Sequence, residues 1–194
     1  MQTNFDKAYY DRFYRDPGTR AVSPATAQRQ SDFITAYIRY LEVPVKRFID
    51  IGCGVGNVLR ALQKAFPRAH GHGVEYSNYL CERYGWEKGS VIDYQPPHRV
   101  DLVLCNDVLG YLDDAACKQA IRNLAEMTSG ALFIGVLTQE DLGLCDPQRT
   151  DSQQIVRSLA WYQRRLKPSF VNVGGGLFLR KPLNVTVWNL DRLW

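Results

Sequence analysis

The sequence predicts an α/β protein in which helices cover both faces of a mostly parallel β-sheet that ends in an antiparallel hairpin. Three observations favour this class. Short apolar runs, such as those around 48–51 and 100–106, alternate with segments of helical periodicity, as strands buried on both faces require. A glycine-rich turn joins the first of these strands to a helix. Near the C-terminus, two strand-like segments lie too close together for a crossover helix.

The composition is that of one ordinary globular domain. The hydrophobic share is 45% and the charged share 23%, both close to the averages for globular proteins. We therefore expect a single domain over 1–194, with a helical N-terminal cap over 1–43 and a core over 44–194. No apolar run reaches the roughly 20 residues of a membrane helix, and the first residues lack the pattern of a signal peptide. We expect a cytoplasmic protein without membrane contact.

Charge and cysteine content argue against several kinds of site. The formal net charge is +4, and the basic residues are spread along the chain, so no nucleic-acid partner is expected. The cysteines are odd in number, widely spaced and without a Cys-x-x-Cys pair, which favours neither a disulfide framework nor a metal site. They are Cys53, Cys81, Cys105, Cys117 and Cys145.

Two amphipathic helices are expected before the first strand. Four aromatic residues within 9–14 keep helical spacing, and they either contact a ligand or only dock the helix. Ser23 followed by Pro24 is a helix-start signal, because a capping hydroxyl precedes proline at the first helical position. Pro44 closes this second helix.

The glycine turn after the first strand is the clearest sign of a ligand. Gly52, Gly54 and Gly56 stand at alternate positions before a helical pattern. Glycine reaches left-handed conformations and lets a ligand lie against the main chain, and the helix N-terminus favours polar or anionic groups. A dinucleotide fingerprint would place its third glycine at Asn57, and the ending of a P-loop is absent. An acid, Asp50, stands two residues before the first glycine.

The pattern Asp50-x-Gly52-x-Gly54-x-Gly56 resembles the first motif of the class I S-adenosylmethionine-dependent methyltransferases. The resemblance implies a Rossmann-like three-layer sandwich, with a mostly parallel seven-stranded sheet and an antiparallel C-terminal hairpin strand, and S-adenosyl-L-methionine as cofactor. It also implies that Asp50 helps position the amino group of the cofactor beside the glycine turn. Glu75, at the end of the second expected strand, would accept hydrogen bonds from the ribose hydroxyls.

Two later stretches would complete the cofactor site. Many family members have an acid before an apolar adenine contact where this chain has Ser90 and Val91, and Asp93 lies close enough in sequence to substitute. Asn106 ends the strand over 100–106, in a stretch that resembles the fourth motif of small-molecule methyltransferases. The predicted cofactor-binding residues are Asp50, Gly52, Cys53, Gly54, Gly56, Glu75, Tyr76, Ser90, Val91, Asp93 and Asn106.

Catalysis requires little fixed machinery if the reaction is methyl transfer. Holding an activated donor and an acceptor in line supplies much of the rate enhancement, and a base assists when the acceptor is a hydroxyl or an ammonium. Asp107 is the first candidate base because of its place at the strand end, followed by Tyr10 and Glu140. The polar loop over 138–152 either holds the acceptor or is a mobile connector.

The C-terminal part is expected to close the sheet. Gly130 should end the turn before a strand over 131–137. After one more helix, strands over 170–179 and 185–190 should form the antiparallel hairpin, because their connection is short. The glycines at 174–176 are expected to form a bulge or bend, since no helix follows them.

The sequence thus predicts an S-adenosylmethionine-dependent methyltransferase (EC 2.1.1.-) that acts on an unidentified small molecule. Two alternatives stay open. One is a cofactor-binding module without transfer activity that acts through a protein partner. The other is an RNA or protein methyltransferase, which would require a basic surface. Neither the acceptor atom nor the oligomeric state follows from the residues.

Overall fold

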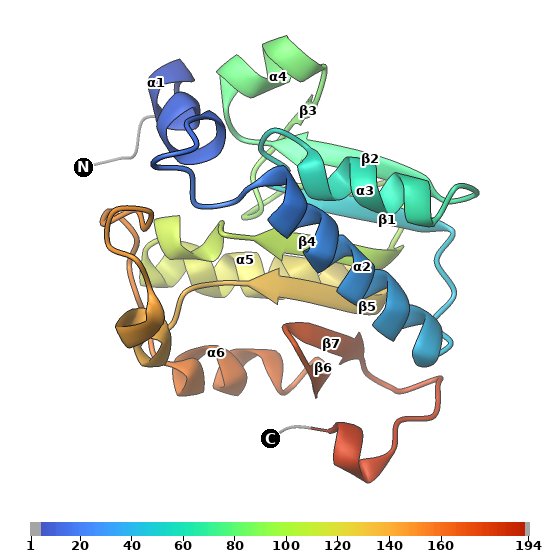
Figure 1. The fold of residues 1–194 in the computed structure, drawn as a ribbon. Coiled ribbons are helices and arrows are strands. Elements are labelled where there is room, and N and C mark those ends of the chain that lie inside the picture. Colours follow the sequence, from blue (N-terminus) through green and yellow to red (C-terminus); the bar gives the residue numbers. More distant parts are fainter. Residues whose placement is uncertain (1–4, 193–194) are drawn as a thin grey trace.

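The computed structural model describes residues 5–192, so residues 1–4 of the predicted N-terminal cap, and 193–194, lie outside the described residues (Figure 1). Its centre is one seven-stranded sheet of order β3-β2-β1-β4-β5-β7-β6. The first five strands are parallel, and β7 pairs antiparallel with β5 and β6. The predicted fold class is confirmed. The strands are β1 (Arg47–Ile51), β2 (His70–Glu75), β3 (Glu87–Lys88), β4 (Val100–Asn106), β5 (Thr128–Gly135), β6 (Phe170–Gly174) and β7 (Leu177–Arg180).

The helices begin at the capping residues that the sequence supplies. Ser23, Ser77 and Asp113 each accept a backbone N–H from the first turn of the helix that follows, which satisfies a donor that the helix itself leaves free. The α-helices are α1 (Lys7–Tyr10), α2 (Pro24–Tyr40), α3 (Asn57–Ala65), α4 (Asn78–Tyr84), α5 (Asp114–Met127) and α6 (Leu159–Leu166); a π-helical turn (Asp11–Arg15) continues α1.

The helices form the two outer layers of the sandwich. Leu102 and Leu104 of β4 pack toward α2 and α3, whereas Val103 and Cys105 of the same strand pack toward α5 and α6. All four side chains are fully buried, as the apolar run predicts for a strand covered on both faces. In Figure 1, α1 and the loop between β5 and α6 lie at the end of the sheet toward which β4 and β5 point.

The C-terminal hairpin differs in position from the prediction. The predicted strand 170–179 is itself the hairpin, and the glycines at 174–176 are its turn, all three with positive φ. Three successive left-handed residues turn the chain back on itself, which a bulge would not do. The predicted second strand over 185–190 is wrong, because these residues contain only a 3₁₀ turn (Asn189–Asp191).

Gly130 also has a different role from the predicted one. Strand β5 begins directly after α5, and Gly130 lies inside it. A Cβ atom built at this glycine would lie 2.6 Å from the carbonyl oxygen of Asp101, beside an irregularity in the pairing of β4 with β5. Gly130 therefore permits a close approach of two backbones, and no turn is present there.

Within residues 5–192, no helix has the length and apolar character to cross a membrane.

Candidate functional site

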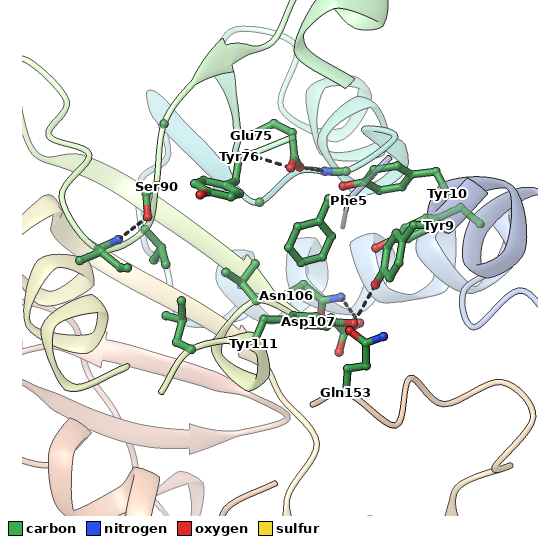
Figure 2. Close-up of a pocket in the computed structure, with 18 of the residues that line it drawn as sticks. Phe5, Tyr9, Tyr10, Glu75, Tyr76, Ser90, Asn106, Asp107, Tyr111 and Gln153 are labelled. Atoms are coloured by element: carbon green, nitrogen blue, oxygen red, sulfur yellow. Dashed lines mark hydrogen bonds between the residues drawn. The ribbon is translucent and has the colours of Figure 1, made fainter. Parts of the chain in front are cut away.

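A cavity of about 420 Å³ opens where β1, β2 and β4 end. Figure 2 shows Tyr9 and Tyr10 on one side of it and Ser90 on the opposite side, with Glu75 and Asp107 on separate walls. Ligands of open α/β sheets bind at such carboxyl ends. The predicted site residues that line this cavity are Tyr10, Gly52, Gly54, Glu75, Tyr76, Ser90, Val91, Asn106 and Asp107.

Four predicted cofactor residues lie outside the cavity lining. Asp50 is buried in β1 directly behind the turn, and the Cys53 thiol is buried as well. Gly56 is the N-cap of α3, where a Cβ atom would meet the Trp86 ring at 2.5 Å. Asp93 is exposed in the turn after Ser90.

The turn after β1 requires glycine for its backbone and for space. Gly52 and Gly54 have φ values of 77° and 56°, a region that other residues enter only with strain. A Cβ atom at Gly52 would lie 2.2 Å from Cγ2 of Val108, whereas the atom nearest to one at Gly54 would be Cε1 of Tyr14, at 3.5 Å. The main chain at Gly54 is therefore open toward the cavity.

Glu75 holds this turn to the end of β2. Its Oε2 accepts a hydrogen bond from the Gly54 N–H at 2.7 Å, and its Oε1 accepts the N–H groups of Tyr76 and Ser77, each at 2.8 Å. A carboxylate has about four lone-pair sites, so one remains for a ligand in the cavity. The sequence predicted the ligand contact, but not that Glu75 also fixes the backbone.

Asp50 is a buried acid in β1. Its exposed fraction is 4%, and none of residues 5–192 donates a hydrogen bond to its carboxyl group. Burial and the nearby charge of Glu75 raise its pKa from 3.8 to about 7. A buried carboxyl group in this state would be stabilised by a ligand that brings a positive charge.

Asp107 faces the cavity from the end of β4. Its φ is 55°, a strained conformation for a residue other than glycine, of the kind that gathers at functional sites. Burial raises its pKa from 3.8 to about 6, although the hydrogen bond from Asn106 Nδ2, at 2.9 Å, opposes this shift. The Asn106 side chain is held in turn by Gln30 of α2.

The sequence also matches a methyltransferase-domain family over residues 14–173. This protein belongs to that family. It is similar in structure to DesVI of Streptomyces venezuelae, with a TM-score of 0.67 and 17% identity over 93% of this chain and 100% of DesVI. It is also similar to the magnesium protoporphyrin IX methyltransferase ChlM of Synechocystis PCC 6803, which was solved with bound S-adenosylhomocysteine. The TM-score is 0.67 and the identity 18%, over 93% of this chain and 98% of ChlM. At these identities the likeness is one of fold.

The family match and the fold confirm the resemblance to class I S-adenosylmethionine-dependent methyltransferases. The sugar N-methyltransferase KedS8 of a Streptoalloteichus species is a further structural neighbour, with a TM-score of 0.52 and 24% identity over 68% of this chain and 55% of KedS8. The family match, together with a fold neighbour solved with bound S-adenosylhomocysteine, indicates S-adenosylmethionine as the cofactor of this protein.

The cavity of this methyltransferase fits that cofactor in chemical terms. The open main chain at Gly54 leaves room beside the turn. Asp50 lies behind that turn and outside the cavity lining, where its carboxyl group would suit an ammonium group. Glu75 retains one acceptor site for a hydroxyl, and Val91 offers an apolar surface.

A chain of three polar side chains beside the cavity was not predicted from the sequence. The Tyr9 and Tyr111 hydroxyl groups are 2.7 Å apart, and the Tyr111 hydroxyl donates to Oδ2 of Asp151 at 3.0 Å. Because the Tyr111 proton goes to the carboxylate, the Tyr9 hydroxyl donates to Tyr111. The sequence offered the aromatic segment and the polar loop as signals. Neither of them shows which residues meet.

The structure shows what surrounds Tyr10 and Glu140, the other two candidate bases. Burial raises the pKa of the Tyr10 hydroxyl, which disfavours its ionised form. Glu140 lies outside the cavity lining, where its carboxylate accepts the Leu159 N–H at the start of α6. Asp107 lines the cavity and stays the first candidate base.

Gly54→Ala is expected to weaken binding of S-adenosylhomocysteine at least tenfold, because the added methyl group enters the space beside the turn. The matched control is Gly85→Ala, whose φ is 72° and whose Cβ atom would have nothing within 4 Å. Both substitutions should lower the free energy of unfolding by about 1 to 2 kcal/mol through backbone strain alone. Denaturant unfolding and calorimetric titration check this. Equal cofactor affinity in the two variants would contradict it.

Proposed function

We propose that this protein transfers the methyl group of S-adenosylmethionine to a small-molecule acceptor held beside Asp107. The observation that carries the proposal is the place of Asp107, a partly buried acid in a strained conformation that faces a cavity lined by the glycine turn and Glu75. The family match supports methyl transfer as the class of reaction. The small-molecule acceptor and its place beside Asp107 are what this proposal adds.

The bound cofactor would supply a methyl group already activated for in-line displacement. The residues of this chain would bind and orient it: Asp50 toward the amino group, Glu75 toward the ribose, and Val91 against the base. Ser90 lies beside Val91, but its hydroxyl accepts the Ile92 N–H at 3.2 Å, so we assign it a role in shaping the turn. Such positioning accounts for most of what a methyltransferase needs to supply.

The aromatic segment would exclude water from the reacting groups. Phe5 packs edge-on against Tyr9 and Tyr111, with ring centres 5.1 and 5.2 Å away. The Ser77 hydroxyl donates to the Phe5 carbonyl at 2.6 Å, which ties the start of the described chain to the end of β2. With water excluded, the carboxylate of Asp107 is a stronger acceptor for a proton of the acceptor molecule.

The test is release of S-adenosylhomocysteine in the presence of candidate acceptors, as a function of pH. For wild type, kcat/KM should rise through about pH 6 as Asp107 ionises, and Asp107→Asn should lose this limb together with about 10²-fold to 10⁴-fold in kcat, as expected for removal of a general base. Asp32→Asn is the matched control, since Asp32 is exposed on α2. An Asp107→Asn enzyme with wild-type kcat would contradict the role.

A further inference from the structure

A second cavity of about 340 Å³ adjoins the first. Tyr9, Tyr14, Asp107 and Tyr111 line both cavities, so Asp107 stands at their junction. The far wall comes from residues 145–154 of the loop between β5 and α6. A molecule in the second cavity can therefore contact the Asp107 carboxyl group, which also faces the first cavity.

The carboxylates of this second cavity differ in whether a positively charged side chain lies beside them. Asp146 lies 3.4 Å from Arg149, and both are well exposed. Neither Asp107 nor Asp151 has a cationic partner within 4 Å among residues 5–192. The lining thus carries two buried or half-buried acids that no positive side chain in the described part of the chain neutralises.

Asp151 is held in a fixed position on this wall. Its exposed fraction is 9%; its Oδ2 accepts the Tyr111 hydroxyl at 3.0 Å, and its Oδ1 accepts the Gln153 N–H at 2.9 Å. Neutral donors satisfy part of the carboxylate but do not remove its charge. A cation in the cavity would provide the missing compensation.

The aromatic lining favours the same kind of ligand. The Tyr9, Tyr14 and Tyr111 side chains all border the cavity, and the face of an aromatic ring attracts a cation. Burial raises the pKa of each of these hydroxyl groups, so the rings are uncharged. The uncompensated carboxylates would repel a carboxylate ligand, and together with the aromatic rings they would attract an ammonium ion.

We propose that the second cavity binds the methyl acceptor, that the acceptor is a small amine bound as an ammonium ion, and that Asp151 is its specificity-determining contact. This inference rests on the proposed function. In the step that follows, the ammonium gives one proton to the Asp107 carboxylate. The nitrogen lone pair then forms a bond to the methyl carbon while the carbon–sulfur bond breaks, its electron pair going to sulfur. The products are an N-methylammonium ion and S-adenosylhomocysteine, and Asp107 returns its proton to water.

The first test compares acceptors of one shape and different charge. Sets such as cyclohexylamine, cyclohexanol and cyclohexanecarboxylate, on several ring and chain skeletons, are incubated with wild type and S-adenosylmethionine, and products are identified by mass spectrometry. Methylation confined to the amines is expected. Methylation of alcohols or carboxylates as fast as amines, or of no amine by a protein that binds S-adenosylhomocysteine, would overturn the inference. A protein that binds no S-adenosylhomocysteine would instead overturn the proposed function.

The second test removes the charge of Asp151 while keeping its shape. For the best amine, Asp151→Asn should raise KM at least tenfold and leave the affinity for S-adenosylhomocysteine within twofold of wild type, because Asp151 does not line the first cavity. Asp32→Asn, the same change on the exposed face of α2, should alter neither. An Asp151→Asn variant with a wild-type KM would contradict the assignment. The first test, on the acceptor preference of wild type, does not depend on whether a variant folds.

Discussion

Replacing Glu75 by glutamine is expected to lower the free energy of unfolding by about 2 to 4 kcal/mol and to abolish measurable binding of S-adenosylhomocysteine. Glutamine keeps one oxygen for two of the three backbone donors. Its amide NH₂ then faces the Gly54 N–H, which lies 2.7 Å from the carboxylate in wild type. A buried donor left without an acceptor costs about 1 to 3 kcal/mol, and hydrogen bonds to a charged group are worth more than neutral ones.

Denaturant unfolding and calorimetry measure the two effects of Glu75→Gln separately. Glu82→Gln is the matched control, because Glu82 is exposed on the neighbouring helix α4. Wild-type stability in Glu75→Gln would contradict the role of Glu75 in fixing the turn. Wild-type affinity would contradict its role toward the ribose. Glu75→Ala is a poorer choice, since it strips all three backbone donors of their acceptor.

Replacing Asp50 by asparagine should move stability and binding in opposite directions. At pH 8 the wild-type carboxylate is ionised in a buried place, and an elevation of its pKa from 3.8 to about 7 corresponds to a destabilisation of up to about 4 kcal/mol. Asparagine has a similar shape and no charge to bury. We therefore expect the ligand-free variant to be more stable than wild type at pH 8, while its affinity for S-adenosylhomocysteine falls at least tenfold.

The pH dependence gives this prediction its sign. Between about pH 4 and pH 7 the Asp50 carboxyl group is ionised in the unfolded chain but protonated in the folded protein. The folded state then binds more protons, so stability falls as pH rises through this range. Asp107 contributes in the same direction up to about pH 6. Asp50→Asn should reduce the fall in the free energy of unfolding over this pH range, and Asp32→Asn should not. A variant less stable than wild type at pH 8 would contradict the interpretation.

Local sequence signals predicted the parts of the fold that depend on neighbouring residues. The run from Phe48 to Ile51 and the alternating glycines specify a strand and a turn, and Ser77 with Gly85 bounds α4 at both ends. In each case one short stretch contains the apolar pattern, the cap and the residue with positive φ. Such elements need no knowledge of the rest of the chain.

Contacts between distant segments were outside the reach of the sequence. Tyr9 and Tyr111 are 102 residues apart, and Tyr111 and Asp151 are 40 apart. The hairpin was misplaced for a related reason, since three glycines are compatible with a bulge or a turn until the pairing of Leu177 with Phe133 fixes the choice. Tertiary packing decided these cases, as it commonly does for strands.

The most direct test of the central claim is calorimetric titration of the wild-type protein with S-adenosylhomocysteine at pH 8, where Asp50 is ionised, with NADH as the control ligand. We predict saturable binding at one site and none for NADH, because the glycine spacing is not that of a dinucleotide site. Absence of saturable binding by S-adenosylhomocysteine would contradict the claim that this cavity holds the methyl donor.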